Sequence, residues 1–280
     1  MKHILRFTSL ILLGVMFGIN SYAQSNSGTN PECIYKYVVS STDKAGSKVE
    51  GNYFGVLQMT PVHSRFIDYS AYAVDSAQVC KAPAGEIKTL SEKEFKNTHY
   101  FTPVIYNIAK DKKLTVYDYI GLDLCKYSEE LPIVKWESVD GSMDVCGYKC
   151  AKAVGSYAGR RWTVWYTPDI PLPYGPWKLI GLPGLVLKAT DADGIHTFEA
   201  ISIRNTAVPC VSRDARDATG TSRDKFIATR NKFMESPMSN IPQESIKEIS
   251  VLKNGDEKTL IINGVPLRNF DGTYIPLELK

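Results

Sequence analysis

Residues 170–190, near the middle of the chain, read IPLPYGPWKLIGLPGLVLKAT. Four prolines and three glycines alternate here with Leu, Ile, Val, Tyr and Trp. Because proline fixes φ and removes a backbone donor, residues 170–177 cannot pair as a central strand, and we expect an extended, polyproline-like crossing of the sheet. The sequence Leu182-Pro183-Gly184-Leu185 then fits a type II turn in which Gly184 supplies the positive φ. Residues 185–187 should leave that turn as a buried strand.

Because apolar residues alternate with the prolines and glycines, we expect this loop to pack as a rigid cover beside the sheet. A rigid loop loses little conformational entropy on binding, so it could offer a preorganised apolar surface to a ligand or partner. The alternative is that the loop only closes the core. The candidate contact residues are Trp165, Tyr166, Pro171, Pro173, Tyr174, Trp177, Leu182 and Pro183, and the candidate turn residues are Gly181 and Gly184.

The segment GRRWTVWYT, residues 159–167, is the clearest strand in the sequence. Alternate residues from Trp162 onward form an apolar face, because side chains in a strand point to opposite sides in turn. The other face carries Arg161, Thr163 and Trp165, which is the composition of a partly wet surface. Trp165 is therefore of particular interest for binding.

Further segments predict a sheet with few helices. IYKYVVS, NYFGVLQM, HSRFIDYS, HYFTPVIYNI and KLTVYDY alternate or run apolar over strand length, and Asp193-Gly194 predicts a hairpin. A helix should follow the cap Ser222 and end before Pro237, and SEKEF from Ser91 favours a shorter one. The predicted fold class is mainly β (α+β): a curved antiparallel sheet, half-barrel-like, with one or two packed helices.

Composition divides the chain into three parts. Residues 1–23 have the charged start, apolar middle and small-residue cleavage site of a secretory signal peptide, with cleavage after Ala23. Residues 24–32 are predicted to be a flexible tail, and residues 33–280 a single β-rich domain. We expect a periplasmic or secreted protein with no membrane span. Removing Lys2 and Arg6 lowers the formal charge from +3 to +1, which favours neither nucleic acid nor an anionic membrane as a partner.

All six cysteines lie in the exported part of the chain. An even number in an oxidising compartment predicts up to three disulfides without fixing their pairing. The candidates are Cys33, Cys80, Cys125, Cys146, Cys150 and Cys210. A soft-metal site for copper or zinc is the alternative, with Met59, His63 or Met143 beside Cys146 and Cys150. Separate disulfides are the preferred interpretation, so we assign neither a metal nor a cofactor.

The sequence offers no catalytic motif. It contains no P-loop, HExxH, GxSxG or GxGxxG, and only His63, His99 and His196 remain after processing, far apart in the sequence. We therefore name no catalytic residue and expect a non-enzymatic protein that binds a ligand or partner through the loop. A hydrolase whose site is assembled from distant residues is the alternative.

The segment WYTPDIPLPYGPWKLIGLPGLVL, preceded by GYKCAKA at residues 147–153, resembles the GLPGLI family of exported Bacteroidota proteins. Val186 stands where the name-giving motif ends in Ile, which is a conservative change. Weaker similarity extends to SRF at Ser64, to LPIVKW ending at Trp136, and to IPLEL at residues 275–279. The resemblance therefore covers nearly the whole mature chain.

This resemblance carries over no catalytic or ligand residues, because none is established for the family. Family genes often neighbour those of outer-membrane receptor-like proteins. The resemblance therefore implies a role at the envelope, with such a protein, or an apolar or peptide ligand, as the partner. Cys150 matches the family's cysteine in GYKC, whereas Cys146 looks like an addition, which leaves its disulfide partner open.

Overall fold

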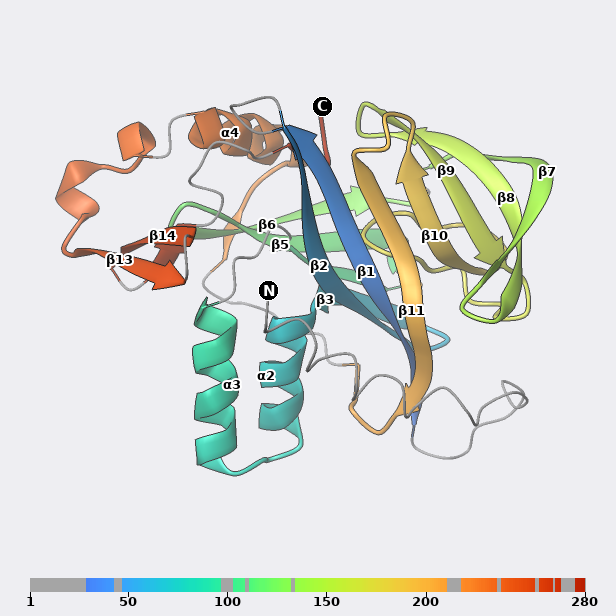
Figure 1. The fold of residues 1–280 in the computed structure, drawn as a ribbon, viewed down its shortest axis with the longest axis horizontal. Helices are drawn as coiled ribbons and strands as arrows, with labels where there is room; N and C mark the ends of the chain where they lie inside the picture. The colour runs from blue at the N-terminus through green and yellow to red at the C-terminus, as the bar shows by residue number, and fades with distance from the viewer. Residues whose placement is uncertain are drawn as a thin grey trace.

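The computed structural model describes residues 29–42, 47–96, 103–108, 111–131, 134–210, 218–235, 238–254, 257–263, 265–267 and 275–279. The predicted signal peptide, residues 1–23, and residues 24–28 of the predicted tail lie outside these ranges. Within them the protein is mainly β, as predicted: a large, curved antiparallel sheet that remains open is accompanied by helices (Figure 1).

The main sheet has twelve strands, in the order β12-β6-β5-β4-β3-β2-β1-β11-β10-β9-β8-β7. Neighbours are antiparallel, except that β12 runs parallel to β6. In chain order the strands are β1 (Asn30–Thr42), β2 (Lys48–Met59), β3 (His63–Asp68), β4 (Val104–Ile108), β5 (Lys113–Ile120), β6 (Asp123–Glu130), β7 (Trp136–Val145), β8 (Tyr148–Tyr157), β9 (Arg160–Thr167), β10 (Leu185–Asp191), β11 (His196–Thr206) and β12 (Thr219–Gly220). The predicted hairpin at Asp193-Gly194 joins β10 to β11, so this prediction is confirmed.

The described residues contain three α-helices, where one or two were predicted. They are α2 (Tyr69–Val79), α3 (Ala84–Lys96) and α4 (Arg223–Glu235), followed by the short 3-10 helices η4 (Met238–Asn240) and η5 (Gln243–Ser245). A second, three-stranded sheet contains β13 (Ile249–Asn254), β14 (Glu257–Ile262) and β15 (Val265–Leu267). In Figure 1, α2 and α3 lie side by side below the sheet, and α4 lies beside one end of it.

The helix starts can be compared with the capping residues in the sequence. The predicted cap Ser222 does precede α4, and its hydroxyl accepts from the Lys225 backbone N–H at 3.3 Å. Helix α3 begins seven residues before the predicted start at Ser91. Helix α2 was not predicted, although Asp68 caps it by accepting from the backbone N–H of Ser70 at 2.8 Å. An Asp followed by an alanine-rich segment was the available signal.

Strand pairing begins earlier than predicted, because β1 starts at Asn30, inside the predicted tail. Glu32 is fully buried there. Its carboxylate accepts from the Tyr72 hydroxyl at 2.7 Å and from Arg204 Nε at 2.5 Å. A buried carboxylate with two donors fixes this part of the chain to α2 and β11, so residues 30–32 belong to the sheet.

The sheet has two differently covered faces. Its inner face carries the main core, to which Tyr37, Trp162, Val164 and Phe198 contribute. Part of its outer face is covered by α2, where Tyr72 packs on three isoleucine and valine side chains of β1, β2 and β3: Ile34, Val56 and Ile67. Every helix among the described residues is too short or too polar to cross a bilayer.

Candidate functional site

The predicted contact loop packs against the inner face of the sheet. The Trp177 ring lies 5.7 Å from that of Trp162 on β9, measured between centroids, and both belong to the main core. Four predicted contact residues are buried there: Tyr166, Tyr174, Trp177 and Leu182. Of the other four, Pro171, Pro173 and Pro183 are exposed, and Trp165 is half-buried on the opposite face. The prediction that the loop's aromatic side chains form a surface is therefore wrong, because Tyr174 and Trp177 fill the core instead.

The two predicted turn glycines have different roles. Gly181 adopts φ +102, so it does supply a left-handed backbone conformation. The type II turn predicted at Gly184 is wrong, because Gly184 is not among the residues with positive φ. Glycine is needed there for space: a Cβ would lie 2.2 Å from the backbone oxygen of Thr167. The predicted buried strand at residues 185–187 is confirmed as the start of β10.

The same block contributes Lys178 to a buried group of charged and phenolic side chains, here named the Lys178 cluster. Its members are Lys178, Tyr127, Glu129, Tyr157, Arg223 and Glu278. Lys178 Nζ lies 2.5 Å from Glu129 Oε1 and 2.8 Å from Glu278 Oε1, and it donates to the Tyr127 hydroxyl at 2.9 Å. Arg223 pairs with the other oxygen of Glu278 at 2.7 Å. Two cations therefore balance two carboxylates.

The Lys178 cluster joins the central block to the C-terminal segment IPLEL. Arg160 holds that segment as well, donating to the carbonyl oxygens of Leu277 at 3.1 Å and Pro276 at 2.7 Å. A third guanidinium nitrogen of Arg160 pairs with buried Asp191 at 2.7 Å. The C-terminal segment is thus attached to the core by charge as well as by packing.

The electrostatics of the cluster are those of a largely buried group of paired charges. Burial, followed by the nearby Glu278 charge, raises the pKa of both Tyr127 and Tyr157, so these phenols stay protonated. Burial would raise the pKa of Glu278 too, but Lys178 and then Arg223 outweigh it and lower that pKa below its ordinary value. The charges of the cluster are paired with one another, and the arrangement suits a structural lock better than proton transfer.

The six cysteines are all free thiols, so the structure shows none of the predicted disulfides. Cys125 on β6 and Cys150 on β8 are both buried in the main core as free thiols. Cys80 and Cys146 are exposed. Cys146 and Gly147 adopt φ +52 and +82, so they form the turn between β7 and β8 that breaks the strand at this point.

The soft-metal alternative gains no support from the described part of the chain. No group of three or more His, Cys, Asp or Glu side chains there is arranged to hold a metal ion. Met59 is buried in the main core, and His63 Nε2 lies 2.9 Å from the carbonyl oxygen of Cys210. These two residues therefore serve packing and local hydrogen bonding.

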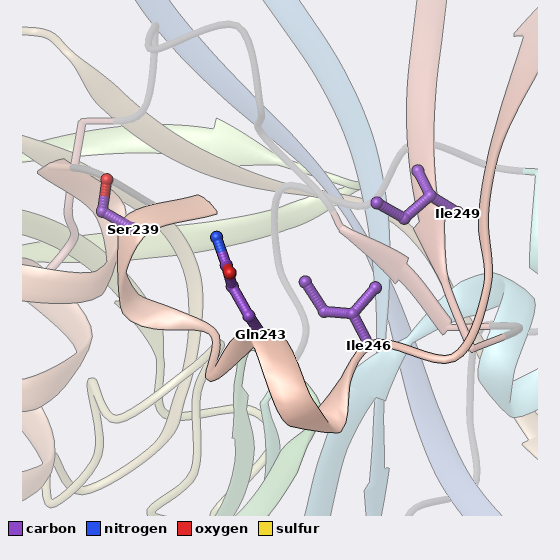
Figure 2. Close-up of a pocket in the computed structure, with 4 residues that line it drawn as sticks. All are labelled: Ser239, Gln243, Ile246 and Ile249. Atoms are coloured by element: carbon purple, nitrogen blue, oxygen red, sulfur yellow. The ribbon is translucent and has the colours of Figure 1, made fainter.

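A hollow of about 550 Å³ lies beside β13, far along the chain from the loop. Figure 2 shows its lining side chains: Ser239, Gln243, Ile246 and Ile249. None of the four carries a charge or an imidazole, so the lining offers no acid–base pair. We assign no chemistry to this hollow.

Two continuous rows of side chains cross the outer face of β7–β11, β1 and β2, strands that lie side by side in Figure 1. Successive members face each other directly across paired strands. The lysine row consists of Val139, Lys152, Trp165, Lys188, Glu199, Lys36 and Phe54. The threonine row, beside it, consists of Glu137, Val154, Thr163, Thr190, Thr197, Val38 and Asn52. None of these residues is buried.

Trp165 lies in the lysine row between Lys152 and Lys188. The Lys152 ammonium is 5.6 Å from the centroid of the Trp165 ring, a cation–π arrangement. Gly141 on β7 permits this close packing, because a Cβ there would lie 3.3 Å from Trp165 Cη2. Farther along the row, Lys188 pairs with Glu199 at 2.9 Å. The face therefore combines an aromatic ring, hydroxyls and cations.

The prediction that Trp165 shares a partly wet face with Arg161 and Thr163 is confirmed. Sequence reasoning missed the other members of the rows, because Lys36 and Lys188 are brought together only by the pairing of β1, β11 and β10. The available signal was a polar residue at alternate positions of otherwise apolar strands, such as Lys36 in IYKYVVS and Lys188 in LVLKAT.

Comparison with known proteins finds solved structures that align with this chain at low identity. Two structures of PNGF-II each align at 14% identity and a TM-score of 0.48, over 81% and 82% of this chain. This chain spans only 35% of the PNGF-II chain. A domain from Vibrio parahaemolyticus, described as outer membrane lipoprotein-sorting, aligns at 7% identity and a TM-score of 0.22, over 74% of this chain and 94% of its own. No family model and no curated protein matches the sequence.

Proposed function

We propose that this chain is an exported, non-enzymatic member of the GLPGLI family that binds a ligand or partner at the cell envelope through the outer face of its sheet. In this proposal residues 1–23 are removed after Ala23, and the mature protein works in the periplasm or outside the cell. The partner is an envelope component, with an outer-membrane receptor-like protein among the candidates.

The observation that carries the proposal is the uncovered pair of rows centred on Trp165. The lysine and threonine rows each cross seven strands, and no member is buried, while their inner-face neighbours Ala153, Val164 and Phe198 are 0% exposed. Phe54 at one end of the lysine row is 42% exposed and Val139 at the other 38%. A broad face with accessible apolar side chains is typical of an interaction site.

Binding is favoured over catalysis by the state of the titratable groups. The Lys178 cluster gathers two carboxylates, two cations and two phenols, but its members are paired with one another in the core. The cluster joins Lys178 of the GLPGLV block to Glu278 of the IPLEL ending, the two segments on which the resemblance rests, at 2.8 Å.

Co-sedimentation of the purified protein with native envelope fragments tests this function. We expect wild-type protein to sediment and Trp165→Ala to remain largely in the supernatant. The matched control is Tyr119→Ala, which removes an aromatic side chain that is 49% exposed on β5. The double variant Pro171→Ala/Pro173→Ala alters exposed loop residues and should bind as wild type does. Loss of binding in the loop variant alone would show that the loop is the site.

A further inference from the structure

Building on that function, we propose that the outer face binds a linear polysaccharide bearing carboxylate groups, laid across the strands along the lysine row. The occupant is inferred from three features of the face: the spacing of its cations, the setting of Trp165 and the hydroxyls beside it.

The cations of the lysine row recur on every second strand. Lys152 lies on β8, Lys188 on β10 and Lys36 on β1, each separated from the next by one intervening strand. Neighbouring strands lie about 4.8 Å apart, so successive lysines are spaced by about 10 Å and the seven-strand row spans about 29 Å. That spacing is comparable to a disaccharide unit, so a polymer with regularly repeated carboxylates matches the row.

The row carries an excess of positive charge. Three lysines are set against Glu199 in this row and Glu137 at the end of the threonine row, and Glu199 is already paired with Lys188 at 2.9 Å. Lys36 is exposed at one end, and the Lys152 ammonium lies over the face of Trp165. An anionic ligand is therefore the complementary partner, since opposite charge attracts it and like charge rejects a basic one.

Trp165 supplies a stacking surface between two of these cations. Aromatic rings bury large apolar area with defined geometry, and a sugar ring has one apolar face of similar size. Trp165 is half-buried, and a Cβ at Gly141 of β7 would lie 3.3 Å from its Cη2 atom, so the ring packs closely on the neighbouring strands. A half-buried ring suits a chain lying across the strands, whereas insertion into a lipid surface requires a protruding side chain.

The threonine row lies beside this track and matches a polyol. Thr163, Thr190 and Thr197 face one another on β9, β10 and β11, and the Thr197 hydroxyl contacts that of Thr190 at 3.3 Å. Each hydroxyl can both donate and accept a hydrogen bond. A sugar chain along the lysine row would present its own hydroxyls to this second row.

The test measures binding of the mature protein to polygalacturonate by titration calorimetry. Methyl-esterified polygalacturonate has the same sugar backbone without the charge, and polyglutamate has the carboxylates without the sugar. We expect polygalacturonate to bind at least tenfold more tightly than either, with affinity falling as salt rises. Trp165→Ala and the double variant Lys152→Gln/Lys188→Gln should each lose at least tenfold. Lys88→Gln, on the exposed surface of α3, should bind as wild type does.

Several outcomes would overturn the inference. Equal affinity for polyglutamate would mean a general anion surface, and binding only to phosphatidylglycerol vesicles would mean a membrane contact. Absence of polygalacturonate binding would reject the polysaccharide, while envelope co-sedimentation that still depends on Trp165 would leave the proposed function standing. If Trp165→Ala also sediments with the envelope normally, both proposals fail. The lysine variants stay informative should Trp165→Ala unfold, since their side chains lie on the solvent side of the sheet.

Discussion

Lys178 brings a positive charge into the core, where two carboxylates and two phenols surround it. Its side chain is 1% exposed, and Glu278 beside it is 3% exposed. A buried ion pair contributes little net stability when it forms, but removing one partner leaves an uncompensated charge in a low-dielectric interior. The cost of breaking the Lys178 cluster should therefore be large, and larger than for any exposed pair.

Replacing Lys178 by methionine should lower the free energy of unfolding by about 3–5 kcal/mol, because Glu129 and Glu278 lose their shared cation. The matched control is Lys188→Met, which removes a lysine from the half-exposed pair with Glu199 and should cost at most about 1 kcal/mol. Urea denaturation of both variants provides the measurement. Equal losses would show that the cluster does not act as a lock.

His196 is a second buried titratable residue, hydrogen-bonded through Nδ1 to the Tyr37 hydroxyl at 2.8 Å. Burial, followed by the charge of Arg160, lowers its pKa from 6.5 to about 3. In the unfolded chain His196 therefore takes up a proton below about pH 6.5. In the folded protein the same imidazole stays neutral until about pH 3. Stability from the neutral imidazole is complete above pH 6.5 and is lost progressively as the pH falls through this window.

Between pH 7 and pH 5 the wild type should lose about 2 kcal/mol more unfolding free energy than His196→Gln, at about 1.4 kcal/mol per pH unit below 6.5. Glutamine is polar but does not titrate, so it removes only the proton linkage. Denaturation at the two pH values measures the difference. The same pH dependence in both proteins would rule out His196 as its source.

At the level of secondary-structure elements, backbone hydrogen bonds hold the loop of residues 168–184 in place. Its backbone is hydrogen-bonded to itself and to β10: the N–H of Leu185 donates to the Ile170 oxygen at 3.0 Å and that of Val186 to the Tyr174 oxygen at 2.9 Å. Gly184 allows β10 to approach the end of β9, where Thr167 lies. Trp177 adopts φ +54, an unfavourable conformation for a non-glycine residue that the surrounding packing maintains.

Gly184→Ala should destabilise the protein by about 1–3 kcal/mol, because the added Cβ meets backbone that cannot move aside cheaply. Gly85→Ala is the control: its Cβ would meet nothing within 4 Å on α3, and replacing a helical glycine usually stabilises. Thermal denaturation compares the two. An unchanged melting temperature for Gly184→Ala would mean that the loop relaxes around the methyl group.

The elements were predictable where a local pattern sets them. Alternation in GRRWTVWYT, the Asp193-Gly194 turn and the Ser222 cap each depend on neighbouring residues, and each prediction is confirmed. The position of the loop was not predictable in the same way. Proline and glycine correctly excluded a strand, and the interleaved apolar residues favoured a packed loop, but the local sequence left open whether Tyr174 and Trp177 fill the core or form a surface. Lys178 was missed because its partners lie about 50 and 100 residues away along the chain.

At the scale of the whole molecule, the sheet separates a closed interior from a partly exposed outer face. The burial of the six cysteines differs between these two regions. Cys33, Cys125, Cys150 and Cys210 are buried, whereas Cys80 and Cys146 are exposed. Burial raises the pKa of Cys150 and of Cys210 to about 11, so little reactive thiolate forms on either at neutral pH.

Alkylation of the native protein at pH 7 should therefore modify Cys80 and Cys146 rapidly and the four buried thiols slowly. After denaturation without reductant, all six should react. Mass spectrometry of the labelled peptides gives the count under both conditions. Fewer than six modified cysteines in the denatured protein would show that disulfides form, as the sequence had led us to expect.

The outer face was predictable from sequence at only one strand. Trp165 and its neighbours on β9 were placed correctly, because a strand's two faces follow from alternation alone. The rows that extend from it depend on the register of seven strands, and a slip of one residue in any of them would turn its side chains to the other face. The proposed binding surface is thus a property of the assembled sheet.

The most direct test of the account is hydroxyl-radical footprinting of the protein bound to native envelope fragments. We predict that oxidation of Trp165 and Phe54 falls on binding, because the occupant covers the lysine row. Oxidation of Tyr119, and of Pro171 and Pro173 in the loop, should be unchanged. Protection of the loop prolines with Trp165 oxidised as in the free protein would contradict the claim that the outer face is the binding site.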